Sequence, residues 1–267
     1  MGISLETAVG LYKSIRQRGL SGTALILGKQ DLVFGIDSLL IALAEAGCFV
    51  RVGDEVQMPL EQVAIVESFR QSGRIFGATP AQFAAGDRRI SDEFFFTLAG
   101  FSSVYSVDYS DFEGAGIIHD LNRLGLSAKL PPCNFIYDGG TLEHVFHVPN
   151  VLQNIFETLA VGGYVLHHAP SNNLLDHGFY QFSPTLFWDF YHANGYEEIA
   201  CSVFVNVRGV FYYRDYHPGE LLKVSHGGLD ESTYYTGCWA RKGAATTGDR
   251  IPQQGVYTSL WDAGKIK

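Results

Sequence analysis

Four short apolar runs between residues 103 and 173 each end on a charged or ionisable side chain, and this pattern limits the fold more than any other feature. The runs and the residues that follow them are Val104–Val107 with Asp108, Gly116–Ile118 with His119 and Asp120, Phe135–Tyr137 with Asp138, and Gly163–Leu166 with His167 and His168. Apolar runs of this length are typical of strands buried in a parallel sheet. Because ligands bind at the carboxyl ends of such strands, we expect these side chains to line one crevice.

The pattern around these runs predicts an α/β fold, a Rossmann-like, doubly wound and mostly parallel sheet. Thr23–Leu27 forms a further apolar run, and helical spacing of apolar residues follows it at Ile36–Ala46. Pro149–Leu159 and Pro184–Ala193 also have helical spacing. The alternation in Cys48–Val52 predicts another strand, with a place in the same sheet.

Two β-rich segments in the last third, Ile199–Val207 and Tyr234–Ala240, predict an antiparallel edge of the sheet. Between Tyr109 and Gly116 only eight residues link two of the apolar runs, fewer than the dozen or so that a parallel crossover usually takes. Either this link is a single turn, or one of the two runs is not a central strand.

The expected domain organisation is one α/β domain over residues 1–242 and a C-terminal tail over residues 243–267. Residues from about 55 to 100 have a helical pattern that is longer than a crossover requires, which predicts an inserted helical layer. Ser91-Asp92-Glu93 predicts the N-terminal cap of one of its helices. We expect the tail to dock either on the body of the protein or on a second copy of the chain in a homodimer.

Composition excludes several classes of partner. The formal net charge is −9, and phosphate backbones or anionic membranes require a basic footprint, so we expect neither nucleic acid nor membrane as a partner. No apolar run approaches the length of a membrane span, and basic residues follow the first apolar positions, the wrong order for a secretory signal. These features predict a cytoplasmic protein. The four cysteines are widely separated, and we expect them to be reduced core residues.

A strand, a glycine turn and a helix in succession predict the start of a nucleotide-binding unit. Gly28 ends the run Thr23–Leu27, and Lys29 and Gln30 follow it before the helix. Such a turn brings backbone N–H groups and a helix N-terminus close to an anionic ligand. A single glycine also fits an ordinary turn, and this alternative stays open.

The segment from Phe135 to Val145 (FIYDGGTLEHV) and the segment from Leu159 to Leu166 (LAVGGYVL) together resemble class I S-adenosylmethionine-dependent methyltransferases. In that family an aspartate ends the fourth strand and a glycine-rich turn leads into the fifth. The likeness is greatest to bacterial methyltransferase-domain proteins with segments similar to Tyr109–Gly114, His119–Asn122 and Gly178–Pro184. The resemblance implies S-adenosylmethionine as the cofactor and a small polar acceptor, such as a sugar or natural-product hydroxyl or amine.

The resemblance also implies which residues bind the cofactor. They are Gly28, Lys29 and Gln30 at the methionine carboxylate, Asp108 and Tyr109 at the ribose, Asp120 and Leu121 at the adenine, and Asp138 and Gly139 beside the methionine part and the acceptor. Each aspartate also has an alternative role as an ordinary turn residue. The family's glycine turn carries an acid two residues before its first glycine and a second glycine two residues after it, where this chain has Ile26 and Gln30.

Histidines supply candidates for the proton acceptor of methyl transfer. His168 and His177 lie at or after the fifth predicted strand, in or near a long polar and aromatic loop, and His144 follows Glu143. His144 and His147 share a helix face, and with His167, His168, Asp176 and His177 nearby a metal site is an alternative. We expect ordinary helix-start or core histidines and no metal.

Two other function classes stay open. A binding or scaffold protein could have kept the fold and lost the cofactor, and the single glycine of the turn favours this alternative. A nicotinamide-dependent enzyme is the other, but the chain lacks the pattern G-x-G-x-x-G.

Overall fold

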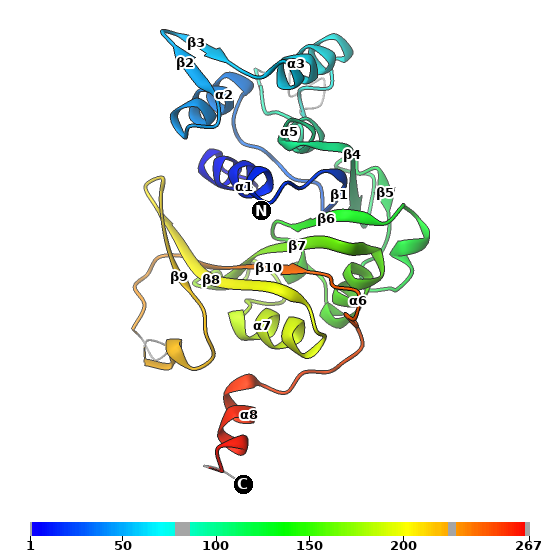
Figure 1. The fold of residues 1–267 in the computed structure, drawn as a ribbon, viewed down its shortest axis with the longest axis vertical. Helices are drawn as coiled ribbons and strands as arrows, with labels where there is room; N and C mark the ends of the chain where they lie inside the picture. The colour runs from blue at the N-terminus through cyan, green and yellow to red at the C-terminus, as the bar shows by residue number, and fades with distance from the viewer. Residues whose placement is uncertain (1, 78–85, 224–227, 265–267) are drawn as a thin grey trace. The chain divides into compact units, whose positions relative to one another are not determined.

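The computed structural model describes residues 2–77, 86–223 and 228–264 of the 267-residue chain (Figure 1). It divides into two compact units, Met1–Ile118 and His119–Lys267. Each unit has its own strands, helices and buried side chains.

Three parallel strands in the order β5-β4-β1 form the sheet of the first unit. β1 (Gly22–Leu27) pairs with β4 (Phe101–Asp108), which pairs in turn with β5 (Ile117–Ile118). The last four residues of β1 are fully buried, as is typical of a parallel strand with both faces covered. The strands that the apolar runs predict here are confirmed.

The described part of the first unit contains four helices, α1 (Leu5–Gln17), α2 (Ile36–Glu45), α3 (Leu60–Ser72) and α5 (Asp92–Ala99). Of these, α1 and α5 begin at a serine cap. The Oγ atom of Ser91 accepts a hydrogen bond from the N–H of Phe94 (3.1 Å), which confirms the predicted cap of α5. Phe94, Phe95 and Phe96 are fully buried, so α5 is a core helix.

The prediction that Cys48–Val52 joins the main sheet is wrong. Within the described ranges, β2 (Val50–Val52) pairs only with β3 (Glu55–Gln57), in a separate antiparallel hairpin. Gly53 has a φ of 62°, and this left-handed residue reverses the chain. Most residues of the hairpin are exposed, so they lack the buried face that a strand of the main sheet would have.

The short link between β4 and β5 is explained by the size of β5. β5 consists of Ile117 and Ile118, which pair with β4 at the edge of the first unit's three strands. Residues 109–116 contain no helix and turn directly from one strand to the next. The run Gly116–Ile118 is therefore an edge strand, not a central one.

The part of the second unit that the structure describes has five strands in the order β6-β7-β10-β8-β9. They are β6 (Cys133–Asp138), β7 (Leu159–Asn172), β8 (Glu197–Val207), β9 (Val210–Asp215) and β10 (Tyr234–Arg241). β6 and β7 are parallel, while β10 is antiparallel to both β7 and β8, so β6, β7 and β8 run in one direction. Together the two units confirm the predicted α/β class, with a mostly parallel sheet and an antiparallel edge.

At the antiparallel edge β8 and β10 are neighbours, as predicted. Cys201 and Cys238 face each other in this register and form a disulfide, so the expectation that all four cysteines are reduced is wrong for this pair. β9 was not predicted, because most of its residues are exposed and show no apolar alternation. Arg208 and Gly209 both have positive φ, which is the geometry of a tight hairpin turn between β8 and β9.

β7 is longer than its apolar run suggests. The sequence places His167 and His168 at the end of a strand that finishes at Leu166, but β7 continues to Asn172. The reason is its second partner: β10 pairs with β7 as far as Asn172, beyond the point where β6 ends. His167 is thus inside the strand, level with Asp138, the last residue of β6.

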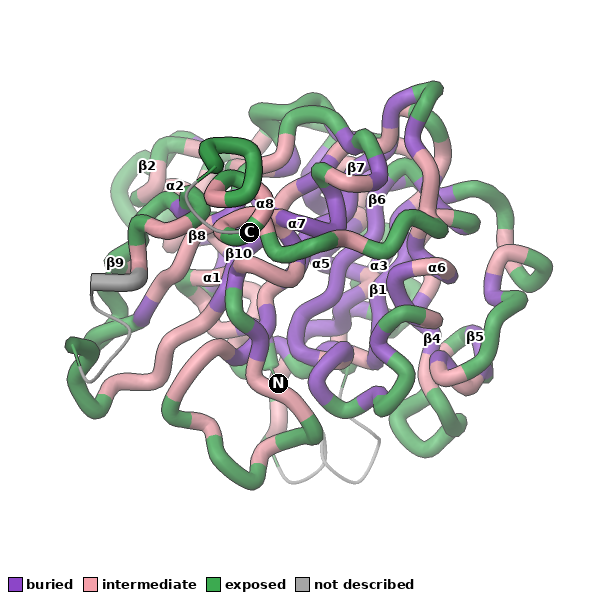
Figure 2. The backbone as a smooth tube through the Cα atoms, turned by 90° about the horizontal axis from the view of Figure 1, so that it is seen from below, coloured by how far each residue is buried: buried purple, intermediate pink, exposed green. Residues whose placement is uncertain are grey.

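The helices of the second unit are α6 (Val148–Thr158), α7 (Pro184–Ala193) and α8 (Gly255–Asp262), with short 3-10 turns η1 (Leu126–Ala128), η2 (Leu142–His144) and η3 (Glu220–Lys223). Figure 2 shows the buried residues gathered along β6 and β7. The tail docks on its own unit at Asp189, whose Oδ2 accepts a hydrogen bond from the N–H of Gly255 (2.8 Å). α8 itself buries no residue. Among the described residues, no helix has the length and apolar character to cross a membrane.

Candidate functional site

The glycine turn after β1 is tied directly to the end of β4. Gly28 has a φ of 68°, a left-handed conformation that favours glycine, and its N–H donates to the carbonyl of Val107 (2.8 Å). The next N–H, of Lys29, donates to Oδ2 of Asp108 (3.3 Å). Two of the residues that the resemblance assigns to the cofactor, Gly28 and Asp108, therefore lie side by side.

Asp108 is half-buried and its carboxylate is oriented by backbone donors. Besides the N–H of Lys29, the N–H of Tyr109 donates to its other oxygen, Oδ1 (2.6 Å). An ionised carboxylate has about four acceptor positions, so two remain for a ligand. The ring of Tyr109 is 74% exposed and lies outside the core.

Asp92, at the start of α5, holds the side chain of Lys29 and the backbone N–H of Gln30. The ammonium group of Lys29 forms an ion pair with Oδ1 of Asp92, whose side chain is only 1% exposed. The N–H of Gln30 donates to the other oxygen of Asp92 (3.3 Å), and its side-chain amide donates to the carbonyl of Leu27 (3.3 Å). The charge of Lys29 is thus already balanced, and a ligand carboxylate there would compete with Asp92.

A cavity of about 710 Å³ adjoins this turn within the first unit. Its walls include Lys29, Gln30 and Asp92 on one side and residues 111–114, from the link after β4, on another. The volume is in the range of small-molecule sites, which is about 300–1,000 Å³. Both signs of charge line it, including the guanidinium groups of Arg74 and Arg89.

In the second unit, Asp138 is fully buried at the end of β6 and shapes the turn that follows. Its Oδ1 accepts hydrogen bonds from the N–H groups of Thr141 (3.0 Å) and Leu142 (3.2 Å), which start η2. Its Oδ2 contacts Nδ1 of His167 at 2.7 Å. Gly139, also buried, is part of the same turn. All of these contacts fix the backbone that leads to Glu143.

His167 continues this chain of hydrogen bonds into the core. Its Nε2 lies 2.6 Å from the hydroxyl of Tyr191 on α7, and both side chains are fully buried. Burial raises the pKa of Tyr191 well above its usual value, so the hydroxyl is protonated and donates to Nε2. His167 therefore donates from Nδ1 to Asp138, and the three side chains are a satisfied polar network rather than a metal site.

His168 points to the other side of β7. Its Nδ1 lies 3.2 Å from the hydroxyl of Tyr137, and among the described residues its Nε2 has no hydrogen-bond partner. Burial lowers the pKa of His168 to about 4, although the charge of Asp138 acts in the opposite direction. The half-buried imidazole is therefore neutral at neutral pH, the form that can accept a proton.

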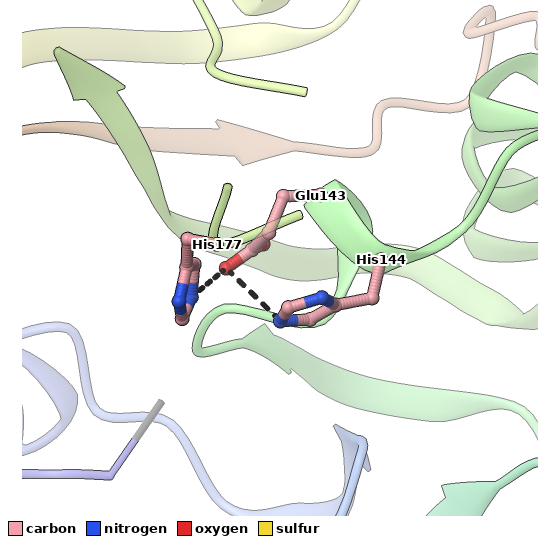
Figure 3. A group of neighbouring side chains, drawn as sticks. All are labelled: Glu143, His144 and His177. Carbon is pink, nitrogen blue, oxygen red and sulfur yellow. Dashed lines mark ion pairs between the residues drawn. The ribbon is translucent and has the colours of Figure 1, made fainter. Parts of the chain in front are cut away.

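Glu143, His144 and His177 lie together beside the turn (Figure 3). Glu143 is fully buried, and its Oε1 lies 3.5 Å from Nε2 of His177 and 3.8 Å from Nε2 of His144. Burial, and then the charge of Asp138, raises the pKa of Glu143 to about 7. Burial and the neighbouring His177 lower the pKa of His144. The sequence analysis gave His144 and His177 as candidate proton acceptors and did not include Glu143 among the site residues.

The remaining predicted site residues, Asp120 and Leu121, form a turn of their own in the second unit. Oδ1 of Asp120 accepts hydrogen bonds from the N–H (3.0 Å) and the side-chain amide (2.8 Å) of Asn122. These bonds lower the pKa of Asp120. Leu121 is buried, while Asp120 is half-buried and keeps Oδ2 for other contacts.

No family model and no curated protein matches the chain. Among solved structures, a SAM-dependent methyltransferase from Archaeoglobus fulgidus is similar at 11% identity and a TM-score of 0.41, over 88% of this chain and 94% of that one. A S-adenosylmethionine-dependent methyltransferase from Clostridium acetobutylicum is similar at 9% identity and a TM-score of 0.35, over 90% and 92%.

Sequence reasoning missed three contributors to these sites. Asp92 was identified only as part of a helix cap, and Tyr191 carries no local motif that links it to His167. Glu143 stands next to a candidate histidine, but nothing in the sequence says that its side chain is buried. Burial of a carboxylate depends on tertiary packing, which spacing along the chain does not reveal.

Proposed function

We propose that the chain is a S-adenosylmethionine-dependent methyltransferase that acts on a small polar acceptor by O- or N-methylation. The observation that carries the proposal is the contact between Asp108 and the backbone of the glycine turn, Lys29 N–H to Asp108 Oδ2 at 3.3 Å. An acid at the end of one strand, beside the glycine turn after a neighbouring parallel strand, is the arrangement with which Rossmann-like folds bind a ribose.

Asp108 suits this role because its orientation is fixed before a ligand binds. Two backbone N–H groups hold the carboxylate, and about two acceptor positions stay open for a pair of hydroxyls. The adjoining cavity of about 710 Å³ has room for a nucleoside-sized ligand. We assign the remaining contacts from the resemblance: Gly28, Lys29 and Gln30, Tyr109, Asp120 with Leu121, and Asp138 with Gly139.

When bound, the cofactor supplies a methyl group on a positively charged sulfur. The chain must hold the acceptor in line with that methyl group and remove the acceptor's proton as the new bond forms and S-adenosylhomocysteine leaves. His168 is our first candidate for the proton acceptor, since its imidazole is neutral and its Nε2 has no partner among the described residues. His177 and His144 are the other candidates.

The loop after β7 supports a small-molecule acceptor. It presents the ring of Phe179, 66% exposed, in edge contact with the ring of Phe146, 61% exposed. Polar side chains alternate with these rings, and the net charge of −9 disfavours a phosphate backbone. Exposed aromatic and polar groups together suit hydrogen-bonded recognition of a sugar or natural product. Cytoplasmic location and a homodimer stay predictions.

Methyl transfer from isotope-labelled S-adenosylmethionine to a panel of small hydroxyl and amine compounds tests the proposal. Wild-type protein should label at least one compound. Asp108→Ala should lose most of the activity at limiting cofactor, while Asp54→Ala, an exposed acid in the β2–β3 turn, should keep it. Equal labelling by both variants would place the cofactor elsewhere.

A binding protein that has lost the cofactor is the second candidate. The ion pair between Lys29 and Asp92 favours it, because it leaves the turn without an unbalanced positive charge for the methionine carboxylate. Such a protein would bind neither S-adenosylmethionine nor S-adenosylhomocysteine, so cofactor binding separates the two candidates.

A further inference from the structure

In the cluster of Glu143, His144 and His177, the nearest ionisable groups to the buried carboxylate of Glu143 are the two imidazoles. Neither oxygen of Glu143 has a hydrogen bond among the described residues, and neither does Nε2 of His177, although all three atoms are buried. Native proteins pair nearly all buried polar atoms, and an unpaired one points to a missing water or ion.

The spacing of these atoms fits a cation between them. The ligand atoms of the three residues all lie within 4.8 Å of one another, with separations of 3.5 and 3.8 Å from Glu143 Oε1 to the two imidazole nitrogens. Those separations are too long for hydrogen bonds. An ion held at about 2.0–2.1 Å from each ligand in a tetrahedron would keep the ligands about 3.4 Å apart.

Hydrogen bonds to the backbone hold both segments of the cluster in place, η2 with Glu143 and His144 and the loop with His177. Asp138 fixes the start of η2, which carries Glu143 and His144. The carbonyl of Glu143 then accepts hydrogen bonds from the N–H groups of Phe179 (2.8 Å) and Tyr180 (3.3 Å), which docks the His177 loop. A Cβ on Gly178 would lie only 2.8 Å from that carbonyl oxygen, so glycine permits this close approach. The ligands are therefore oriented without an ion.

We propose that Glu143, His144 and His177 bind one divalent transition-metal ion of the zinc class. Two imidazoles and one carboxylate favour zinc or a similar ion over magnesium or calcium, which prefer oxygen ligands. The carboxylate oxygen and the two imidazole nitrogens supply three lone pairs for a cation. Three protein ligands leave at least one coordination position for water or an oxygen of a substrate.

The metal would give the cluster a role distinct from proton transfer. His144 and His177 would be ligands, which leaves His168 as the proton acceptor of the proposed methyl transfer. Metal binding itself does not depend on that activity, because it requires only the three side chains. A failure of the methyl-transfer assay therefore leaves the proposed metal site intact. Absence of zinc binding likewise leaves the proposed methyl transfer intact.

Zinc titration of chelator-treated full-length protein tests the site. Calorimetry with ZnCl₂ should show one ion per chain. Glu143→Gln, His144→Ala and His177→Ala should each weaken binding by more than about 100-fold, since losing even an outer partner of a metal ligand costs about 10–100-fold. His147→Ala is the matched control: its exposed side chain lies on the same segment, outside the cluster, and the variant should bind as wild type does.

The unfolding temperature distinguishes a loss of metal binding from a loss of folding. Without metal, Glu143→Gln should unfold at the same or a higher temperature than wild type, because neither oxygen of Glu143 makes a hydrogen bond that the substitution would break. Added ZnCl₂ should raise the unfolding temperature of wild type and not that of Glu143→Gln. Absence of stoichiometric zinc binding, or unchanged binding in all three ligand variants, would overturn the proposal.

Discussion

Asp92 and Lys29 form an ion pair in which the carboxylate is almost fully buried and the ammonium group reaches it from the turn after β1. The pair joins the start of α5 to the glycine turn within the first unit. Asp92 also accepts a hydrogen bond from the N–H of Gln30, so one side chain supports two consecutive residues of the turn. The turn that would meet a cofactor is thus held by a residue far away in the sequence.

Asp92→Asn should destabilise the first unit by about 1–3 kcal/mol, because the ammonium group of Lys29 loses its charged partner. Urea unfolding measures the change. Asp37→Asn is the control, since Asp37 also lies in the first turn of its helix, α2, but is exposed. Equal stability of the two variants would show that the ion pair contributes nothing.

Tyr191→Phe should lower the free energy of unfolding by about 1–3 kcal/mol, because it leaves Nε2 of buried His167 without a donor. Tyr196→Phe offers a matched comparison. The hydroxyl of Tyr196 is also buried but has no partner among the described residues, so its removal should be neutral or stabilising. Thermal or urea unfolding of both variants checks the contrast, and a similar loss in both would contradict the network.

The low pKa of His168 predicts a pH dependence of stability. Its folded pKa of about 4 is below the usual 6.5, so the folded state binds this proton less tightly than the unfolded state. The contribution is fully present above pH 6.5 and is lost as the pH falls toward 4. The full shift corresponds to about 3 kcal/mol, and we expect about 2 kcal/mol because the ring is only half-buried.

Urea unfolding of wild type and His168→Gln between pH 7 and pH 4 isolates this contribution. Wild type should lose about 2 kcal/mol more than the variant over that range. Parallel curves for the two proteins would mean that His168 titrates in the folded state as it does in the unfolded chain.

Gly178→Ala should weaken zinc binding without removing a ligand. The added methyl group would lie 2.8 Å from the carbonyl oxygen of Glu143 and would push the His177 loop away. We expect a loss of about tenfold or more, comparable to the loss of an outer partner. Gly10→Ala, where no atom lies within 4 Å of an added methyl group, controls for the substitution itself. Wild-type affinity in Gly178→Ala would contradict the positioning role.

The sequence predicted the strands best, since their apolar runs are continuous and buried. β1, β4, β6 and the β8–β10 pair all lie where the pattern placed them. The predictions were wrong where the extent or pairing of a strand depends on the neighbouring strand. The exposed hairpin of β2 and β3 has the alternation of a sheet strand, and β7 extends past His168 only because β10 continues beside it.

The candidate sites were predicted only in part, because some of their contacts also depend on neighbouring segments. Asp108, Gly28 and His177 stand in motifs or after strands, and these positions can be read along the chain. Burial of Glu143 and the contact of Lys29 with Asp92 arise from segments that meet only after folding. Residue types and spacing reveal which side chains can do chemistry, whereas tertiary packing determines which of them have partners.

Asp108→Ala should reduce the affinity for S-adenosylhomocysteine about ten- to a hundredfold, the effect of losing a hydrogen bond to a charged group. The exposed residue Asp54 again provides the control, and Asp54→Ala should bind as wild type does. Calorimetry of the three proteins makes the comparison. Unchanged affinity in Asp108→Ala would mean that another residue meets the ribose.

Calorimetric titration of the wild-type protein with S-adenosylhomocysteine tests the central claim most directly, because it requires no knowledge of the acceptor. We predict one site per chain with a dissociation constant in the micromolar range. Absence of binding at millimolar ligand, by a protein shown to be folded, would contradict the proposed methyltransferase function and favour the binding protein that has lost its cofactor.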